Sequence, residues 1–156
     1  MKKNNRSFWR FALLIYSTVM FFLLFARSSN RMEGLNYTQL LQQNINLTPL
    51  LTIRNYWHVL QNGTAPALVR HCFINLAGNI LLFIPFGILL PQCFQRLKNF
   101  FWFFLTCTAG ICLVELGQLV TLVGSLDVDD LILNLSGAVL GFLLYLPSAG
   151  KKGKKS

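Results

Sequence analysis

The sequence predicts an all-α membrane protein, a compact bundle of about four transmembrane helices with both termini in the cytoplasm. Its 156 residues are 54% hydrophobic and only 12% charged, and the mean hydropathy is +0.51. A soluble domain of this length would carry about twice that charged fraction. Four segments are nearly uncharged. Basic residues lie before the first segment, between the second and the third, and after the fourth, which is one side of the predicted bundle. Together these observations predict the fold class.

The apolar segments predict helices over residues 8–26, 72–90, 100–123 and 128–146. A helix needs roughly 20 residues to cross the hydrocarbon core, with ~17 as a practical minimum. The middle two segments reach this length without help. The first reaches it if Arg10 extends its charged head toward water, and the last reaches it from Val128.

The basic residues concentrate on one side of this predicted bundle. Ten of the fourteen Lys and Arg residues lie in segment 1–10, in the loop with Arg96 and Lys98, and in segment 147–156. None of the five acidic residues lies in these regions. The positive-inside rule places them in the cytoplasm. The charge therefore predicts a lipid bilayer, not a nucleic acid, as the partner, and anionic head groups suit the Lys-rich tail.

This topology divides the chain into three parts. Residues 1–10 form a basic cytoplasmic N-terminus, residues 11–146 a membrane domain, and residues 147–156 a Lys-rich cytoplasmic tail. Within the membrane domain, residues 27–71 form a long external loop.

Polar residues near the outer ends of three helices predict a functional cluster. Helical depth advances by ~1.5 Å per residue, which places these residues at one level. Spacings of three or four residues also put neighbours on a shared helix face. The cluster comprises Asn75, Asn79, Glu115, Gln118, Asp127, Asp129, Asp130 and Asn134.

Glu115 is the member least easily explained by structure alone, because an ionisable residue inside a membrane segment is a functional-site candidate by default. Other members have a structural alternative. One of the three aspartates could cap the fourth helix and complement its dipole. Asn75 and Asn134 could serve as interhelical hydrogen bonds worth ~0.6 kcal/mol each.

Four further residues have structural expectations. Pro85 is expected to loosen the second helix, and Gly87 to allow close backbone approach. Gly137 and Gly141 have the small-xxx-small spacing that is typical of helix packing in membranes.

Several ordered motifs resemble the VanZ-like family of small bacterial membrane proteins over residues 11–146. The motifs are Asn75-x3-Asn79-Ile-Leu-Leu-Phe-Ile-Pro85-Phe-Gly87, Glu115-x2-Gln118 and Asp127-Val-Asp-Asp130-x3-Asn134-x2-Gly137-x3-Gly141. In the external loop, Asn46-Leu-Thr-Pro-Leu50 looks like the family's Asn-Leu-x-Pro-Phe stretch, with Leu50 in place of Phe.

The resemblance implies a compact helical domain in a bacterial cell membrane. The family's namesake is an accessory factor that lowers susceptibility to teicoplanin, a lipid-bearing glycopeptide, with no known enzymatic activity. The favoured hypothesis is therefore a non-enzymatic factor at the outer leaflet, without a cofactor or catalytic residue. Its partner would be a lipid-linked cell-wall precursor or a lipoglycopeptide.

The alternative is a small membrane enzyme that acts on a lipid-linked head group. Asp127, Asp129 and Asp130 would then hold a divalent cation, which carboxylates do for phosphate chemistry. Glu115 would be the general acid or base. The sequence leaves open whether the aspartates bind a cation, and it leaves open the oligomeric state.

Overall fold

The computed structural model describes residues 3–26, 34–63 and 65–153. Parts of the predicted N-terminus, external loop and Lys-rich tail (1–2, 27–33, 64 and 154–156) lie outside these residues. The elements are α1 (Lys3–Phe25), α2 (Tyr37–Gln43), β1 (Ile45–Asn46), α3 (Leu51–Asn62), α4 (Pro66–Cys93), the 3-10 helix η1 (Gln95–Lys98), α5 (Phe100–Thr121), β2 (Leu126–Asp127) and α6 (Val128–Gly153).

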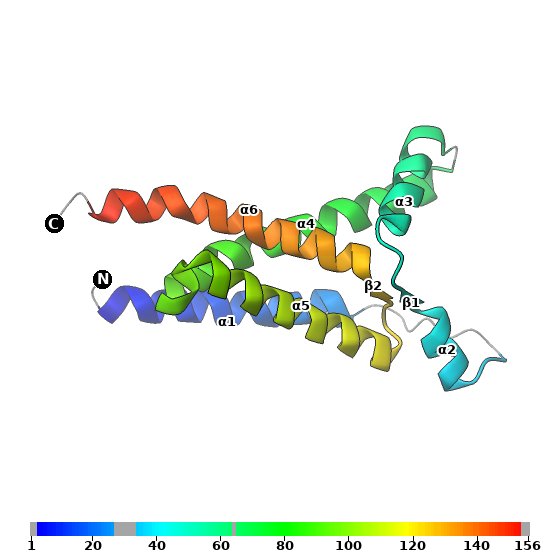
Figure 1. The fold of residues 1–156 in the computed structure, drawn as a ribbon, viewed down its shortest axis with the longest axis horizontal. Coiled ribbons are helices and arrows are strands. Elements are labelled where there is room, and N and C mark those ends of the chain that lie inside the picture. Colours follow the sequence, from blue (N-terminus) through cyan, green and yellow to red (C-terminus); the bar gives the residue numbers. More distant parts are fainter. Residues whose placement is uncertain (1–2, 27–33, 64, 154–156) are drawn as a thin grey trace.

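Within the described residues, four helices (α1, α4, α5 and α6) are long and apolar enough to cross a membrane. They run roughly along the long axis of the molecule, and both ends of the chain lie at the same end of the bundle (Figure 1). The predicted all-α fold class is thus confirmed. The helix α4 begins at Pro66, earlier than the predicted residue 72, so it projects beyond the other three toward α3.

Small residues bring α4 and α6 into the most extensive helix contact of the bundle. A Cβ atom added at Gly137 would lie 2.1 Å from the carbonyl oxygen of Ile80, and one added at Gly141 would lie 2.0 Å from that of Ile84. On the facing helix, a Cβ at Gly87 would lie 2.0 Å from the Ala138 carbonyl oxygen. The two backbones therefore touch where these glycines lie. Close approach of this kind replaces the hydrophobic driving force that lipid does not provide.

The helix α4 continues through Pro85 and Pro91 without a break. A proline inside a helix removes one backbone donor and crowds the preceding turn. In a membrane bundle this cost is tolerated because neighbouring helices support the altered turn. The expected loosening at Pro85 therefore does not interrupt the helix.

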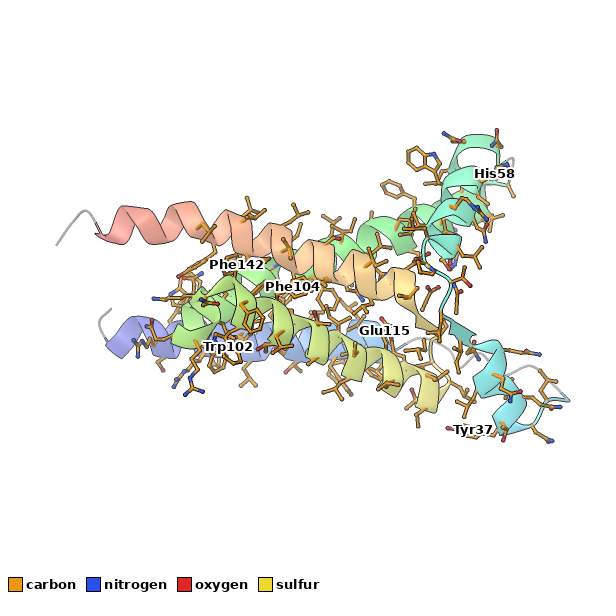
Figure 2. All side chains as sticks on the ribbon, viewed as in Figure 1. Tyr37, His58, Trp102, Phe104, Glu115 and Phe142 are labelled. Carbon is orange, nitrogen blue, oxygen red and sulfur yellow. The ribbon has the colours of Figure 1, made fainter. Side chains whose placement is uncertain are left out.

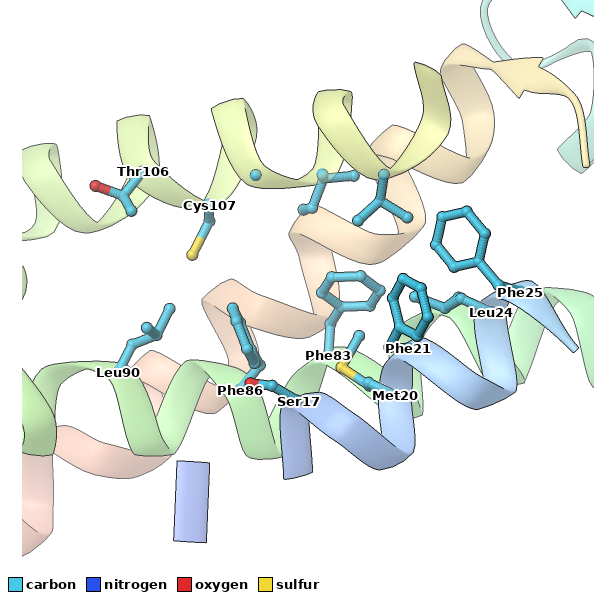
Figure 3. A pocket seen from close by; sticks show the side chains of 13 residues that line it. Ser17, Met20, Phe21, Leu24, Phe25, Phe83, Phe86, Leu90, Thr106 and Cys107 are labelled. Carbon is cyan, nitrogen blue, oxygen red and sulfur yellow. The ribbon is translucent and has the colours of Figure 1, made fainter. Parts of the chain in front are cut away.

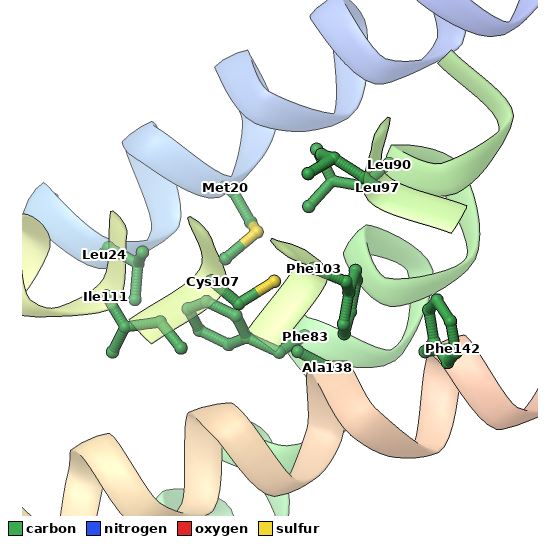
Figure 4. Packing of buried hydrophobic residues seen from close by; sticks show 10 residues of the cluster. All are labelled: Met20, Leu24, Phe83, Leu90, Leu97, Phe103, Cys107, Ile111, Ala138 and Phe142. Atoms are coloured by element: carbon green, nitrogen blue, oxygen red, sulfur yellow. The ribbon is translucent and has the colours of Figure 1, made fainter. Parts of the chain in front are cut away.

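An apolar core fills the middle of the bundle, with side chains from all four long helices (Figure 4). Phe103 of α5 is fully buried and packs against Phe142 of α6, with ring centroids 4.6 Å apart. Met20 of α1 and Phe83 of α4 are also buried in this core. Buried aromatic rings dominate core energetics, so this contact ties α5 to α6.

The end of the bundle opposite the termini is built from α2, α3 and the two short strands (Figure 1). The strands β1 and β2 pair in parallel, with Ile45 opposite Leu126 and Asn46 opposite Asp127. The Tyr37 hydroxyl donates to the carbonyl oxygen of Val120 at 2.8 Å, which joins α2 to the end of α5. These contacts hold the segment before α4 against the α5–α6 turn.

Candidate functional site

A polar cleft of about 560 Å³ lies at this end of the bundle, between α3, α4, α5, β2 and the start of α6. Four of the residues predicted from sequence line it: Asn75, Gln118, Asp127 and Asp130. The remaining lining residues are Thr52, Tyr56, His71, Ile74, Val123, Gly124 and Ser125. The space is therefore walled mainly by hydrogen-bonding groups, in a chain that is otherwise strongly apolar.

Asp127 joins three elements through its carboxylate. One oxygen, Oδ2, accepts from the Thr52 hydroxyl at 2.6 Å and from the Asn46 amide at 3.2 Å. The other, Oδ1, accepts from the backbone N–H of Asp129 at 2.9 Å. The last bond is the geometry of a helix N-cap, which satisfies a backbone donor in the first turn of α6. Among the three aspartates, Asp127 is thus the one that caps α6.

Asp129 has a different structural role, because it caps a helix distant in sequence. Its side chain is fully buried and accepts from the backbone N–H groups of Leu50 at 2.5 Å and Ile53 at 3.0 Å. Leu50 immediately precedes α3 and Ile53 lies in its first turn. A carboxylate at this point accepts from two backbone N–H groups that have no partner within the helix, and it complements the positive end of the helix dipole. Asp129 is not among the residues that line the cleft.

Asp130 faces the cleft and is held in place from α4. Its Oδ1 accepts from the Asn79 amide at 2.6 Å, and Asn79 also donates to Asn75 Oδ1 at 3.5 Å. Asn79 is buried, whereas Asn75 and Asp130 are half-buried. The two asparagines therefore form a short polar row that positions Asp130.

Glu115 and Asn134 form a buried pair outside the residues that line the cleft. The Asn134 amide donates to Glu115 Oε1 at 3.3 Å, and the two residues are 2% and 3% exposed respectively. The pair joins α5 to α6 within the long apolar helices of the bundle. Glu115 therefore does not line the cleft, and its place is consistent with a supporting role.

Gln118 joins the cleft to α1. Its side-chain amide donates to the Leu24 carbonyl oxygen at 2.9 Å. Its backbone carbonyl oxygen accepts from the backbone N–H groups of Val123 and Gly124. The side chain is buried. Gln118 thereby fixes both the end of α1 and the turn that follows α5.

The cleft also contains residues that the sequence reasoning did not select, namely Thr52, Tyr56, His71 and Ser125. The rings of Tyr56 in α3 and His71 in α4 meet edge to face, with centroids 6.1 Å apart. His71 is isolated in the sequence, so sequence reasoning gives it no functional role. One sequence signal could have suggested a place in the cleft. His71 and Asn75 are polar residues four positions apart in an otherwise apolar segment, so they lie on the same face of a helix.

The carboxylates at this end do not meet at one point. Asp127 binds Asn46 and Thr52, Asp129 binds the start of α3, and Asp130 binds Asn79. Within the described part of the chain, no three His, Cys, Asp or Glu side chains are placed to hold a metal ion together. The described lining residues include two carboxylates and no Lys or Arg. Such a cleft favours a ligand that brings hydrogen-bond donors, such as hydroxyl or ammonium groups.

Comparisons with known proteins agree with the sequence motifs. The VanZ/LLP1 family model matches residues 12–149. The chain is also 27% identical over 128 residues to "Protein VanZ" of Enterococcus faecium, an alignment that covers 82% of this chain and 66% of that protein. No solved structure matches the chain. Because the matched region holds the polar cleft and the greater part of every long helix, this chain belongs to the VanZ/LLP1 family.

Proposed function

We propose that this chain is a non-enzymatic accessory factor of a bacterial cell membrane that lowers susceptibility to teicoplanin. The observation that carries the proposal is the polar cleft, in which Asp127 and Asp130 stand among amide and hydroxyl groups at one end of an apolar bundle. Membership of the VanZ/LLP1 family supports the link to a glycopeptide antibiotic.

The orientation that suits this function places the cleft at the outer surface. The start of α1, which carries Arg6 and Arg10, lies at the opposite end of the bundle (Figure 1). Arg96 of η1 lines the same cleft as these two arginines, and the positive-inside rule favours the cytoplasm for this end. The polar cleft then lies at the level of the outer head groups, where a lipoglycopeptide or a lipid-linked cell-wall precursor presents its polar part.

The ligand chemistry follows from the lining. Carboxylate and amide oxygens accept hydrogen bonds from sugar hydroxyls and from amino groups, and both are found on a lipoglycopeptide and on a wall precursor. Asp127 and Asp130 would make the direct contacts. Asn79 would hold Asp130 in place, and the Glu115–Asn134 pair would support the cleft from within the bundle.

The two histidines provide a matched pair for the test. His71 lines the cleft, whereas His58 lies on the exposed face of α3 near its far end (Figure 2). The inhibitory concentrations of teicoplanin and vancomycin would be measured in a susceptible Gram-positive host with and without the protein. The same assay would include Asp130→Asn, His71→Ala and His58→Ala, each with its amount in the membrane quantified.

The proposal expects the wild-type protein and His58→Ala to raise the inhibitory concentration of teicoplanin alone. Asp130→Asn and His71→Ala should lose that protection at equal membrane abundance. Full protection by both cleft variants would remove the cleft from the mechanism. An absence of protection by well-expressed wild-type protein would overturn the proposed function.

A further inference from the structure

A second cavity lies against the apolar core, on the side of the bundle where α1 and α5 face each other. It has a volume of about 300 Å³ and is lined by apolar groups from α1, α4 and α5. Figure 3 shows Met20 and Phe21 of α1 and Phe83 and Phe86 of α4 on one side, with Cys107 of α5 opposite. The cavity exists because α1 packs mainly against α4, and α5 mainly against α6.

The cavity is open to the side of the bundle. Phe21, Thr106 and Gly110 are all exposed although they line it. A Cβ atom added at Gly110 would meet nothing within 4 Å. A lipid tail from the surrounding membrane can therefore enter between α1 and α5 without any change in the backbone.

The end of this cavity near the polar cleft is closed. There Gln118 donates to the Leu24 carbonyl oxygen at 2.9 Å and joins α5 to α1. At the neighbouring residue of α5, a Cβ atom added to Gly117 would lie 3.3 Å from the ring of Phe25. These contacts separate the apolar cavity from the acidic end of the bundle.

Toward the end of the bundle where the termini lie, the cavity continues into a basic cleft of about 450 Å³. The two spaces share Leu90 and Thr106 as lining residues. The basic cleft is lined by three arginines, Arg6 and Arg10 of α1 and Arg96 of η1. None of the described residues that line either space is acidic.

From this continuity we infer that the protein holds one anionic phospholipid, with its phosphate among Arg6, Arg10 and Arg96 and an acyl chain along the α1–α5 cavity. Arginine binds phosphate oxygens through paired N–H donors, and basic pockets between membrane helices are typical sites for anionic head groups. The apolar cavity accounts for the tail, and its closed end sets the direction. The site is separate from the polar cleft and does not depend on the proposed function.

The test is lipid binding to the purified full-length chain in detergent. Phosphatidylglycerol or phosphatidylcholine would be added in turn, and the retained lipid would be counted by native mass spectrometry. We expect one phosphatidylglycerol per chain and a preference over phosphatidylcholine of about fivefold for each arginine in contact. Inorganic phosphate at equal concentration should not displace the lipid.

Two matched pairs of variants test the two parts of the site. Arg96→Gln should lower the affinity for phosphatidylglycerol about fivefold, whereas Lys98→Gln, two residues away and not a lining residue, should not. Gly110→Trp should fill the cavity and lower the affinity about tenfold, as the loss of about two buried methylene groups would. Gly78→Trp is its control, because a Cβ there also meets nothing within 4 Å and Gly78 does not line the cavity.

Equal retention of the two phospholipids would overturn the assignment of the arginines. Equal losses in Arg96→Gln and Lys98→Gln would do the same, since they would indicate general surface charge. Unchanged affinity in Gly110→Trp, or displacement by inorganic phosphate, would overturn the placement of the tail. Recovery of a dimer without lipid would assign the open face to a second copy of the chain.

Discussion

The carboxylate of Asp129 accepts a hydrogen bond from the backbone N–H of Ile53 at 3.0 Å, although the two residues are 76 positions apart. Through this bond, and a second one from Leu50, the start of α6 holds the start of α3. Asp127, two residues earlier, binds Thr52 in the same turn. The acidic segment of this chain thus anchors the structure that forms one wall of the polar cleft.

The first prediction concerns this anchor. Asp129→Asn should lower the free energy of unfolding by about 2–3 kcal/mol, because it replaces a buried charged acceptor by a weaker one and turns an amide donor toward backbone N–H groups. The measurement is the apparent melting temperature in detergent. Asp130→Asn is the matched control, since it removes the same charge from a half-buried residue in the cleft. An equal loss of stability in both variants would contradict the distinction drawn between them.

The second prediction concerns the α4–α6 contact. Gly137→Ala should destabilise the protein by about 3 kcal/mol, because its Cβ would lie 2.1 Å from a backbone oxygen that cannot move without separating the helices. Gly110→Ala should instead stabilise it by about 0.5–1 kcal/mol, because it adds helix propensity where a Cβ has open space. Thermal unfolding of the two variants in one detergent decides the matter. If Gly137→Ala melts like wild type, the close contact is not as described.

The third prediction concerns Leu50, which has a φ of 63° at the start of α3. This left-handed conformation is unfavourable for a residue with a Cβ, whereas glycine adopts it freely. Leu50→Gly should therefore raise the free energy of unfolding by up to about 1 kcal/mol, since the side chain is also largely exposed. Leu47→Gly, at another exposed leucine of the same loop whose φ is not positive, should lower it. Thermal melting of the pair would refute this account if both variants lose stability equally.

The fourth prediction concerns orientation. In a chain whose four cysteines are replaced by alanine, Asn62→Cys at the end of α3 should react with a membrane-impermeant maleimide on intact cells. Lys98→Cys in η1 should react only after the membrane is permeabilised, because its end of the bundle carries the basic residues that favour the cytoplasm. Both positions are exposed in the structure. The opposite labelling pattern would place the polar cleft in the cytoplasm and rule out an outer-leaflet role.

Much of the architecture follows from the sequence alone, because long uncharged segments leave few alternatives to membrane helices. The segments around Cys72–Leu90 and Phe100–Thr121 contain enough apolar residues to predict α4 and α5 without any other information. The Gly137–Gly141 spacing likewise indicated a packing face, and both glycines lie at the α4–α6 contact. Spacing along one helix is a local property, and the sequence records it directly.

What only the tertiary structure decided is which polar groups meet. Asp127, Asp129 and Asp130 are nearly consecutive, yet Asp127 caps α6 and lines the cleft, Asp129 caps α3 away from the cleft, and Asp130 lines the cleft and binds Asn79. The depth of Glu115 along its helix follows from the sequence, but the direction of its side chain does not. In the structure that side chain pairs with Asn134. His71 entered the cleft only because α4 extends past its predicted start and meets α3 there. Sequence patterns determine which segments are apolar enough to form membrane helices. The partner of each buried polar group depends instead on how those helices cross, which is a property of the packed bundle.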